Sequence, residues 1–138
     1  MRLNLGAAVF AFALLSAGGV LAEDLDCKNP QTQSDMTACE QQRQGSADDA
    51  LNAQYKKTRA AAVETDKGMD SADLRGAEKA LVKAQRAWVA FRDAECEVRG
   101  FEMRGGSGEP MLVAGCTADL TDKRTKELKG LADMLAGK

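Results

Sequence analysis

Four cysteines, Cys27, Cys39, Cys96 and Cys116, are the residues of this sequence best suited to form covalent or metal bonds. In a small exported chain, an even number of cysteines is typical of disulfides, whereas zinc sites and redox pairs commonly carry the spacing C-x-x-C. That spacing is absent, and the chain has no histidine to complete a zinc site, so a four-cysteine zinc site is the less favoured alternative. Of the three possible pairings, we predict Cys27 with Cys39 and Cys96 with Cys116, because each pair is local and brackets a turn signal.

Acidic side chains gather in one short stretch that holds Asp93, Glu95, Glu97 and Glu102. A glycosidase needs two carboxylates about 5 Å or about 6.5–9.5 Å apart on either side of a cleft. Acids at the end of one helix are more typical of a solvated surface. Without histidine no Ser-His-Asp set can form. We therefore expect a protein that is not an enzyme and that has no metal site and no cofactor.

A glycine-rich segment, GFEMRGGSGE, spans residues 100–109. It lacks the G-x-x-x-x-G-K-[ST] pattern of a phosphate-binding loop. One interpretation is a flexible connector tied by the second disulfide. The other is a recognition loop, because binding residues are often carried on loops held by a rigid scaffold. The candidate partner-binding residues are Gly105, Gly106, Ser107 and Glu109.

The first 22 residues have the features of a secretory signal peptide. Arg2 precedes an apolar run from Leu5 to Leu15, and small residues lead to a cleavage site after Ala22. The apolar run is too short to span a bilayer comfortably. Cleavage would leave residues 23–138 as one domain with no membrane anchor. The expected location is the periplasm or the exterior of the cell.

The charge of the exported part limits its partners. Removing Arg2 leaves 18 of the 19 basic residues beside 21 acidic ones, a net charge of −3. A nucleic-acid binder would carry a basic patch, so we expect no nucleic-acid partner. Mild acidity favours approach to a cationic partner.

Hydrophobic periodicity and capping signals predict four helices. Asn29 and Pro30 are typical of a helix start, so a short helix is expected over residues 30–43. Gly45 is expected to interrupt, and Ser46-Ala47-Asp48-Asp49 to cap a second helix that ends at Asp66-Lys67-Gly68. This second helix carries an inner stripe formed by Ala47, Leu51, Tyr55, Thr58 and Ala62.

The third helix is expected to begin at Asp70 or Ser71 and to run to about Arg99. The 3-4 spacing of its apolar residues predicts an inner stripe of Leu74, Ala77, Leu81, Ala84, Trp88, Phe91, Glu95 and Val98. Pro110 opens a last helix that runs to about Ala136. Its predicted inner face consists of Val113, Cys116, Leu120, Arg124, Leu128, Leu131 and Leu135.

These elements predict an all-α fold: an elongated hairpin of two long helices with two shorter helices packed on it, stapled by disulfides. Trp88 and Phe91 are expected in the core. At 100° per residue, Arg92 lies on the same helix face as Trp88 and Cys96. Because an unpaired buried charge is costly, Arg92 needs a partner, and Asp48 is the candidate.

The same residues resemble the lysozyme inhibitor LprI-like family of exported bacterial proteins. The core Q-R-A-W followed by R-D-A-E-C carries the resemblance most strongly, and D-x-x-L-N-x-x-Y supports it. A shorter G-G-S, two further cysteines and L-T-x-x-R-x-x-x-L support it. The matching residues that we expect to be structural are Asp48, Leu51, Asn52, Tyr55, Gln85, Arg86, Trp88, Arg92, Asp93 and Arg124. Phe91 stands where the family commonly has tyrosine, and Asp26 precedes Cys27 where a lipoprotein would have a small residue.

The resemblance implies a small helical periplasmic domain that binds and blocks a lysozyme or another cationic muramidase. The alternative function is a periplasmic interaction or envelope-stress module that is neither an enzyme nor an inhibitor.

Overall fold

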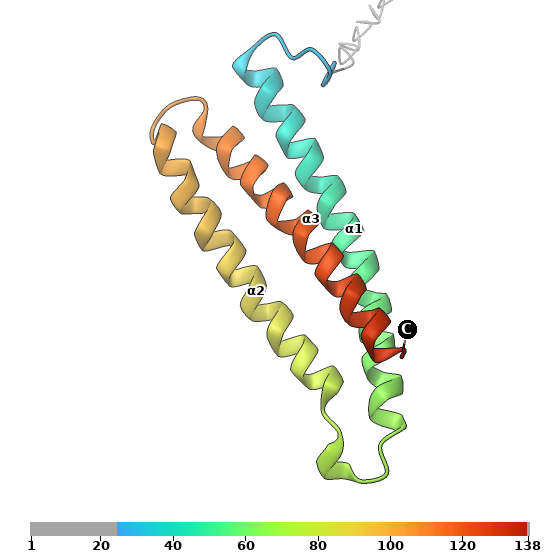
Figure 1. Cartoon of the computed structure of the whole chain (residues 1–138). Coiled ribbons are helices and arrows are strands. Elements are labelled where there is room, and N and C mark those ends of the chain that lie inside the picture. Colours follow the sequence, from blue (N-terminus) through green and yellow to red (C-terminus); the bar gives the residue numbers. More distant parts are fainter. Residues whose placement is uncertain (1–24, 138) are drawn as a thin grey trace, which may run out of the picture.

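The protein, described here over residues 25–137 of a computed structural model, is an elongated three-helix bundle (Figure 1). Helix α1 spans Gln33–Lys67, α2 spans Ala77–Gly100 and α3 spans Glu109–Leu135. Helices α1 and α3 run in the same direction and α2 runs against both. The predicted all-α class is confirmed for the described residues, which contain no strand. The predicted signal peptide at residues 1–22 lies outside them.

The two helices expected over residues 30–65 are one continuous helix, so the predicted break at Gly45 is wrong. Gly45 is exposed, and a Cβ added there would meet no neighbouring atom within 4 Å. Ser46 does not cap a new helix, because its hydroxyl donates to the carbonyl of Gln42 one turn earlier (3.1 Å). A glycine in a helix costs about 1 kcal/mol relative to alanine. Packing of α1 against the other helices offsets that cost.

Helix α1 begins at a different capping residue from the one predicted. The N-cap is Thr32 instead of Asn29. The Thr32 hydroxyl accepts from the N–H of Asp35 (3.1 Å), and the Asp35 carboxylate accepts from the N–H of Thr32 (3.0 Å). This is a capping box in which aspartate takes the position that glutamate usually holds.

Helix α2 begins at Ala77, not at Asp70 or Ser71 as predicted. Its N-cap is Gly76 at φ 142°, a backbone conformation that favours glycine. A short 3₁₀ turn, Ala72–Leu74, precedes it. The donors at the start of α2 are satisfied from the end of α1, because the Asp66 carboxylate accepts from the N–H groups of Gly76 and Ala77 (both 2.8 Å).

The core is formed by small residues and a few leucines. Leu51, Ala62, Leu81 and Leu128 form its central cluster. Most of the tertiary contact lies between α1 and α3. Their facing surfaces are rich in buried alanine and threonine, which lets the two helices approach closely: Ala47, Thr58, Ala62, Ala114, Thr117, Ala118 and Thr121.

This contact changes the predicted architecture. The sequence predicted two long and two shorter helices with a hairpin at the centre. The described chain instead has three long helices, and its most extensive packing joins two parallel helices that are far apart in sequence. The Thr58 hydroxyl links them at 2.9 Å from the carbonyl oxygen of Leu128.

The inner stripes are predicted correctly for α1 and only partly for α2 and α3. Ala47, Leu51, Thr58 and Ala62 are buried in α1 as expected. In α2, Phe91 and Val98 are exposed by 56% and 67%, so their assignment to the core is wrong. Leu74 is also exposed and precedes the helix. In α3, Leu128 is fully buried, but the other fully or nearly buried positions are the alanines and threonines already named.

Both predicted disulfides are confirmed. Cys27 bonds to Cys39 and fastens the lead-in segment to α1, while Cys96 bonds to Cys116 and joins α2 to α3. The four sulfurs are therefore used in pairs, which rules out the zinc alternative. No helix in the described part of the chain is both long and apolar enough to cross a bilayer.

Candidate functional site

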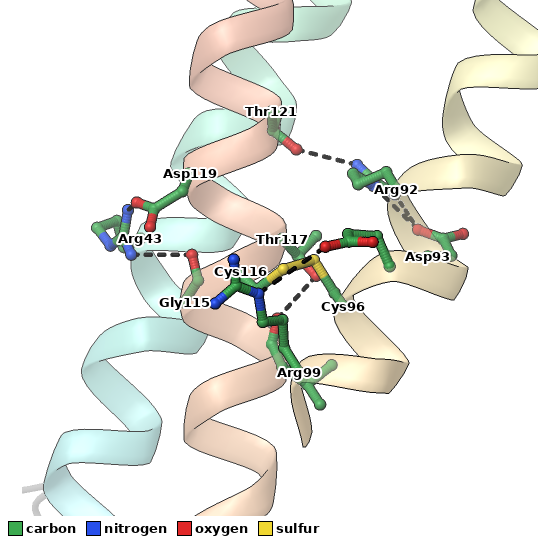
Figure 2. The surroundings of a disulfide bond; sticks show 12 residues. Arg43, Arg92, Asp93, Cys96, Arg99, Gly115, Cys116, Thr117, Asp119 and Thr121 are labelled. Atoms are coloured by element: carbon green, nitrogen blue, oxygen red, sulfur yellow. Dashed lines mark hydrogen bonds and ion pairs between the residues drawn. A yellow bond between two sulfur atoms is a disulfide. The ribbon is translucent and has the colours of Figure 1, made fainter. Parts of the chain in front are cut away.

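The guanidinium of Arg92 joins all three helices near the middle of the bundle. Its Nη1 donates to the carboxylate of Asp48 in α1 (2.8 Å) and to the hydroxyl of Thr121 in α3 (3.1 Å). Its Nε donates to Asp93, the next residue of α2 (2.9 Å). Figure 2 shows the last two of these bonds. The predicted pairing of Arg92 with Asp48 is thus confirmed, and no other residue in the described chain bonds side chains on both other helices through one guanidinium group.

Trp88 lies against two guanidinium groups. The Cζ atom of Arg92 is 5.3 Å from the tryptophan ring centroid, and that of Arg124 is 5.8 Å from it. Arg124 also donates to the buried amide of Gln85 (3.1 Å) and to Glu127 (2.9 Å). A cation over the tryptophan face is attracted by the ring quadrupole. Trp88 is half-buried and packs on the core cluster.

Most of the motif residues therefore hold the helices together. Leu51 belongs to the core cluster and Tyr55 packs against it. Asn52 and Arg86 are exposed. The interhelical contacts of the motif explain why these residue types occur together, but they leave few motif side chains on the surface to contact a partner.

The loop between α2 and α3 is short and held at several points. A 3₁₀ turn, Phe101–Met103, follows α2 directly, so part of the predicted loop is helical. Arg104 then pairs with Glu109 (2.7 Å) and stacks on Phe101, 4.5 Å from its ring centroid. Gly105, at φ 77°, donates its N–H to Glu109 (2.8 Å). Ser107 is exposed between these fixed points.

The two ends of this loop are also fixed by the surrounding helices. Cys96 and Cys116 join α2 and α3 just behind it. Gly100 is buried, and a Cβ there would lie 2.8 Å from Val113 Cγ2, so glycine permits the close approach of the two helices. The loop is therefore tied to both helices and to itself at several points at one end of the bundle.

Glu109 is not available as a proton donor. The hydrogen bond from the N–H of Gly105 and the charge of Arg104 lower the pKa of Glu109. Its carboxylate is therefore ionised and occupied by these two donors at neutral pH. Its role in the structure is to hold the loop, and the freely presented side chain is that of Ser107.

A cleft of about 380 Å³ lies beside the second disulfide. Its apolar floor is formed by Leu112, Cys116 and Leu120 of α3, and charged side chains surround it. Arg43 of α1 crosses to α3 at one rim, where it donates to Asp119 (2.8 Å) and to the carbonyl of Gly115 (3.1 Å; Figure 2).

Sequence reasoning missed this α1–α3 link. Arg43 also donates to Glu40 (2.8 Å), and a Cβ at Gly115 would lie 3.2 Å from the Glu40 carboxylate. Gly115 was the available signal, and a weak one, because Gly130 of α3 and Gly45 of α1 also lie inside helices and a Cβ at either would meet no neighbouring atom within 4 Å. Within residues 25–137, no cluster of histidine, cysteine and acidic residues could hold a metal ion.

Comparison with known proteins gives one family for most of this chain. The model of the family described as "Lysozyme inhibitor LprI" matches residues 26–128. The chain belongs to the LprI lysozyme inhibitor family. The match covers all of α1 and α2 and most of α3, and it includes both disulfides.

A curated relative supports the assignment. An uncharacterized protein of Rhizobium meliloti (strain 1021) is 50% identical over 110 residues, which cover 78% of this chain and 79% of the relative. No solved structure matches the chain. The resemblance to the LprI family inferred from the sequence is thus confirmed. The family is one of inhibitors rather than enzymes, and its description together with two disulfides indicates an exported protein.

Proposed function

We propose that this LprI-family protein acts in the periplasm or outside the cell, where it binds a lysozyme or another cationic muramidase and blocks its substrate groove. The observation that carries the proposal is the loop at the end of the α2–α3 pair, residues 104–109, which Arg104 and Gly105 tie to Glu109. A projection that is already fixed loses little conformational entropy when it enters a groove. Ser107, at its exposed position, is the side chain that would enter first.

Charge supports the approach of such a partner. Residues 23–138 carry a net charge of −3, and animal lysozymes are cationic enzymes. Opposite net charges raise the rate of association more than they raise final affinity. Inhibition should therefore weaken with added salt mainly through a lower association rate.

The test is a cell-wall lysis assay with oxidised residues 23–138, titrated against a c-type and a g-type lysozyme. Ser107→Arg should lower inhibition at least tenfold, because it adds bulk and positive charge at the proposed contact. Ala72→Arg is the matched control, since it adds the same charge at an exposed position in the loop at the other end of the bundle. Equal inhibition by both variants would remove the loop from the proposal.

The second candidate is an envelope interaction or stress module without inhibitory activity. It is favoured by the engagement of Arg92, Trp88 and Arg124 within the bundle, because the family motif then specifies a fold without specifying a binding surface. Absence of inhibition of both lysozymes at large molar excess would support this second function. A pull-down from the periplasmic fraction would then identify the partner.

A further inference from the structure

The face of α2 that points away from the other helices carries an exposed row of apolar side chains. Phe91 and Val98 are its large members within α2, exposed by 56% and 67%. Phe101, in the 3₁₀ turn that follows α2, extends the row; it is exposed by 56% and Arg104 stacks on it. Exposed alanines continue the row toward the start of the helix. We call this row the α2 outer stripe; it consists of Ala80, Ala84, Ala87, Phe91, Ala94, Val98 and Phe101.

The stripe has the spacing of a helix-pairing surface. Successive members are separated alternately by four and three residues, which is the heptad spacing that keeps one seam of an α-helix facing a partner helix. The core-facing residues of α2, such as Leu81, Gln85 and Cys96, lie on the other side. Helix α2 also forms one edge of the bundle in Figure 1. Large apolar groups exposed along such a row mark an interaction surface.

The charges beside the stripe indicate which partner it fits. Exposed basic residues, Lys79, Lys83 and Arg86, occupy the first half of α2, while exposed acidic residues, Asp93 and Glu97, predominate in the second half, where the one exposed basic residue, Arg99, pairs with Glu95 (3.9 Å). Neither Lys83 nor Glu97 forms an ion pair within residues 25–137. A helix with opposite charges in its two halves is complementary to a second copy of itself placed antiparallel.

The side-chain sizes fit the same arrangement. When Phe91 of one copy faces Ala87 of the other, the same antiparallel register places Val98 opposite Ala80 and Ala84 opposite Ala94. Phe91 and Val98 then each meet an alanine of the other copy, so the two helices can interdigitate. This register brings Lys83 of each copy beside Glu97 of the other, twice in the two-fold symmetric pair. Parallel pairing would instead place like charges together.

We propose that two copies of this chain associate through their α2 outer stripes into an antiparallel, two-fold symmetric dimer. The interface is isologous, because the same surface is used on both copies. A single pair of helices lined mostly by alanine is at the small end of the interface sizes that support stable association, about 1,200 Å² in total. The dimer should therefore form and dissociate with concentration. Its two 104–109 loops would lie at opposite ends, and the assembly could bind two partners.

Sedimentation velocity of oxidised residues 23–138, from micromolar to millimolar concentration, tests the proposal. The wild-type chain should shift from monomer to dimer. Phe91→Glu and Val98→Glu should each weaken association at least tenfold while leaving the helical melting curve unchanged, because both side chains are exposed. Met134→Glu is the matched control, since Met134 is an exposed apolar residue of α3 outside the stripe (63%). It should associate like the wild type.

Charge reversal tests the antiparallel register. Lys83→Glu and Glu97→Lys should each weaken association, because each places two like-charged pairs in the symmetric dimer. The double variant should recover it, and an equal mixture of the two single variants should form a heterodimer. A chain that stays monomeric at millimolar concentration, or a dimer that tolerates Phe91→Glu, would overturn the proposal. A double variant that fails to recover would overturn the register. If the chain stays monomeric and the stripe variants lose lysozyme inhibition, the stripe would instead be a contact surface for lysozyme.

Discussion

The ion pair between Arg92 and Asp48 should contribute more to stability than a surface ion pair of the same length. The two charged groups are 2.8 Å apart, and their side chains are exposed by 12% and 36%. Breaking a fully buried pair costs about 3–5 kcal/mol, whereas exposed pairs contribute about 0.2–1 kcal/mol. Because one carboxylate is partly solvated, we expect a coupling energy of about 1–2 kcal/mol between these values.

A double-mutant cycle measures this coupling. Asp48→Ala, Arg92→Ala and the double variant are unfolded in urea and followed by circular dichroism at the helix band. Tryptophan fluorescence is unsuitable, because the ring of Trp88 lies against Arg92 itself. Arg92→Ala alone should cost about 2–4 kcal/mol, since it removes hydrogen bonds to three side chains together with the contact to Trp88.

The chain supplies two controls for this cycle. Asp49→Ala removes the next, exposed aspartate of α1 and measures the change in helix propensity alone. Arg43 and Asp119 form a second pair of the same length between helices, with side chains exposed by 40% and 64%. Its coupling should stay below about 0.5 kcal/mol. A coupling for Arg92 and Asp48 no larger than that of the exposed pair would refute the argument from burial.

Three further predictions concern turns, caps and covalent links. Gly45→Ala should raise the free energy of unfolding by up to about 1 kcal/mol in urea denaturation, because the added methyl meets no neighbour, whereas Gly76→Ala should lower it by about 1–3 kcal/mol because of its positive φ. Hydrogen bonds from three backbone N–H groups lower the pKa of Asp66, so its stabilising contribution is present above about pH 4 and is lost as the pH falls through the lowered pKa. The melting temperature of Asp66→Ala should therefore be lower than that of the wild type at pH 7, and the difference should shrink in acid; a constant difference would contradict this. Dithiothreitol should reduce Cys27–Cys39 before the second disulfide, because Cys27 is exposed, and mass spectrometry of alkylated intermediates would detect the order.

The sequence predicted correctly those helix ends that are set by residues at the ends themselves. The end of α1 at Gly68 and the start of α3 beside Pro110 follow from residues at those positions. The break at Gly45 was wrong because a single glycine costs about 1 kcal/mol, which is less than the burial gained when α1 packs along α3. The start of α2 was wrong because its capping group, Asp66, comes from the preceding helix.

The candidate site was predictable only in part. The sequence by itself favoured the disulfide pairing and the bond between Arg92 and Asp48 that the structure shows, because a short separation favours local cysteine pairs and an arginine on a core-facing stripe needs a nearby acid. Periodicity alone could not choose between two overlapping apolar stripes on α2. Only the tertiary structure decided that Trp88 faces inward while Phe91 and Val98 face solvent. The deciding factor was the close packing of α1 on α3. Helix α2 packs on this pair with the face that carries Leu81 and Trp88, and its residues Phe91 and Val98 stay exposed to solvent.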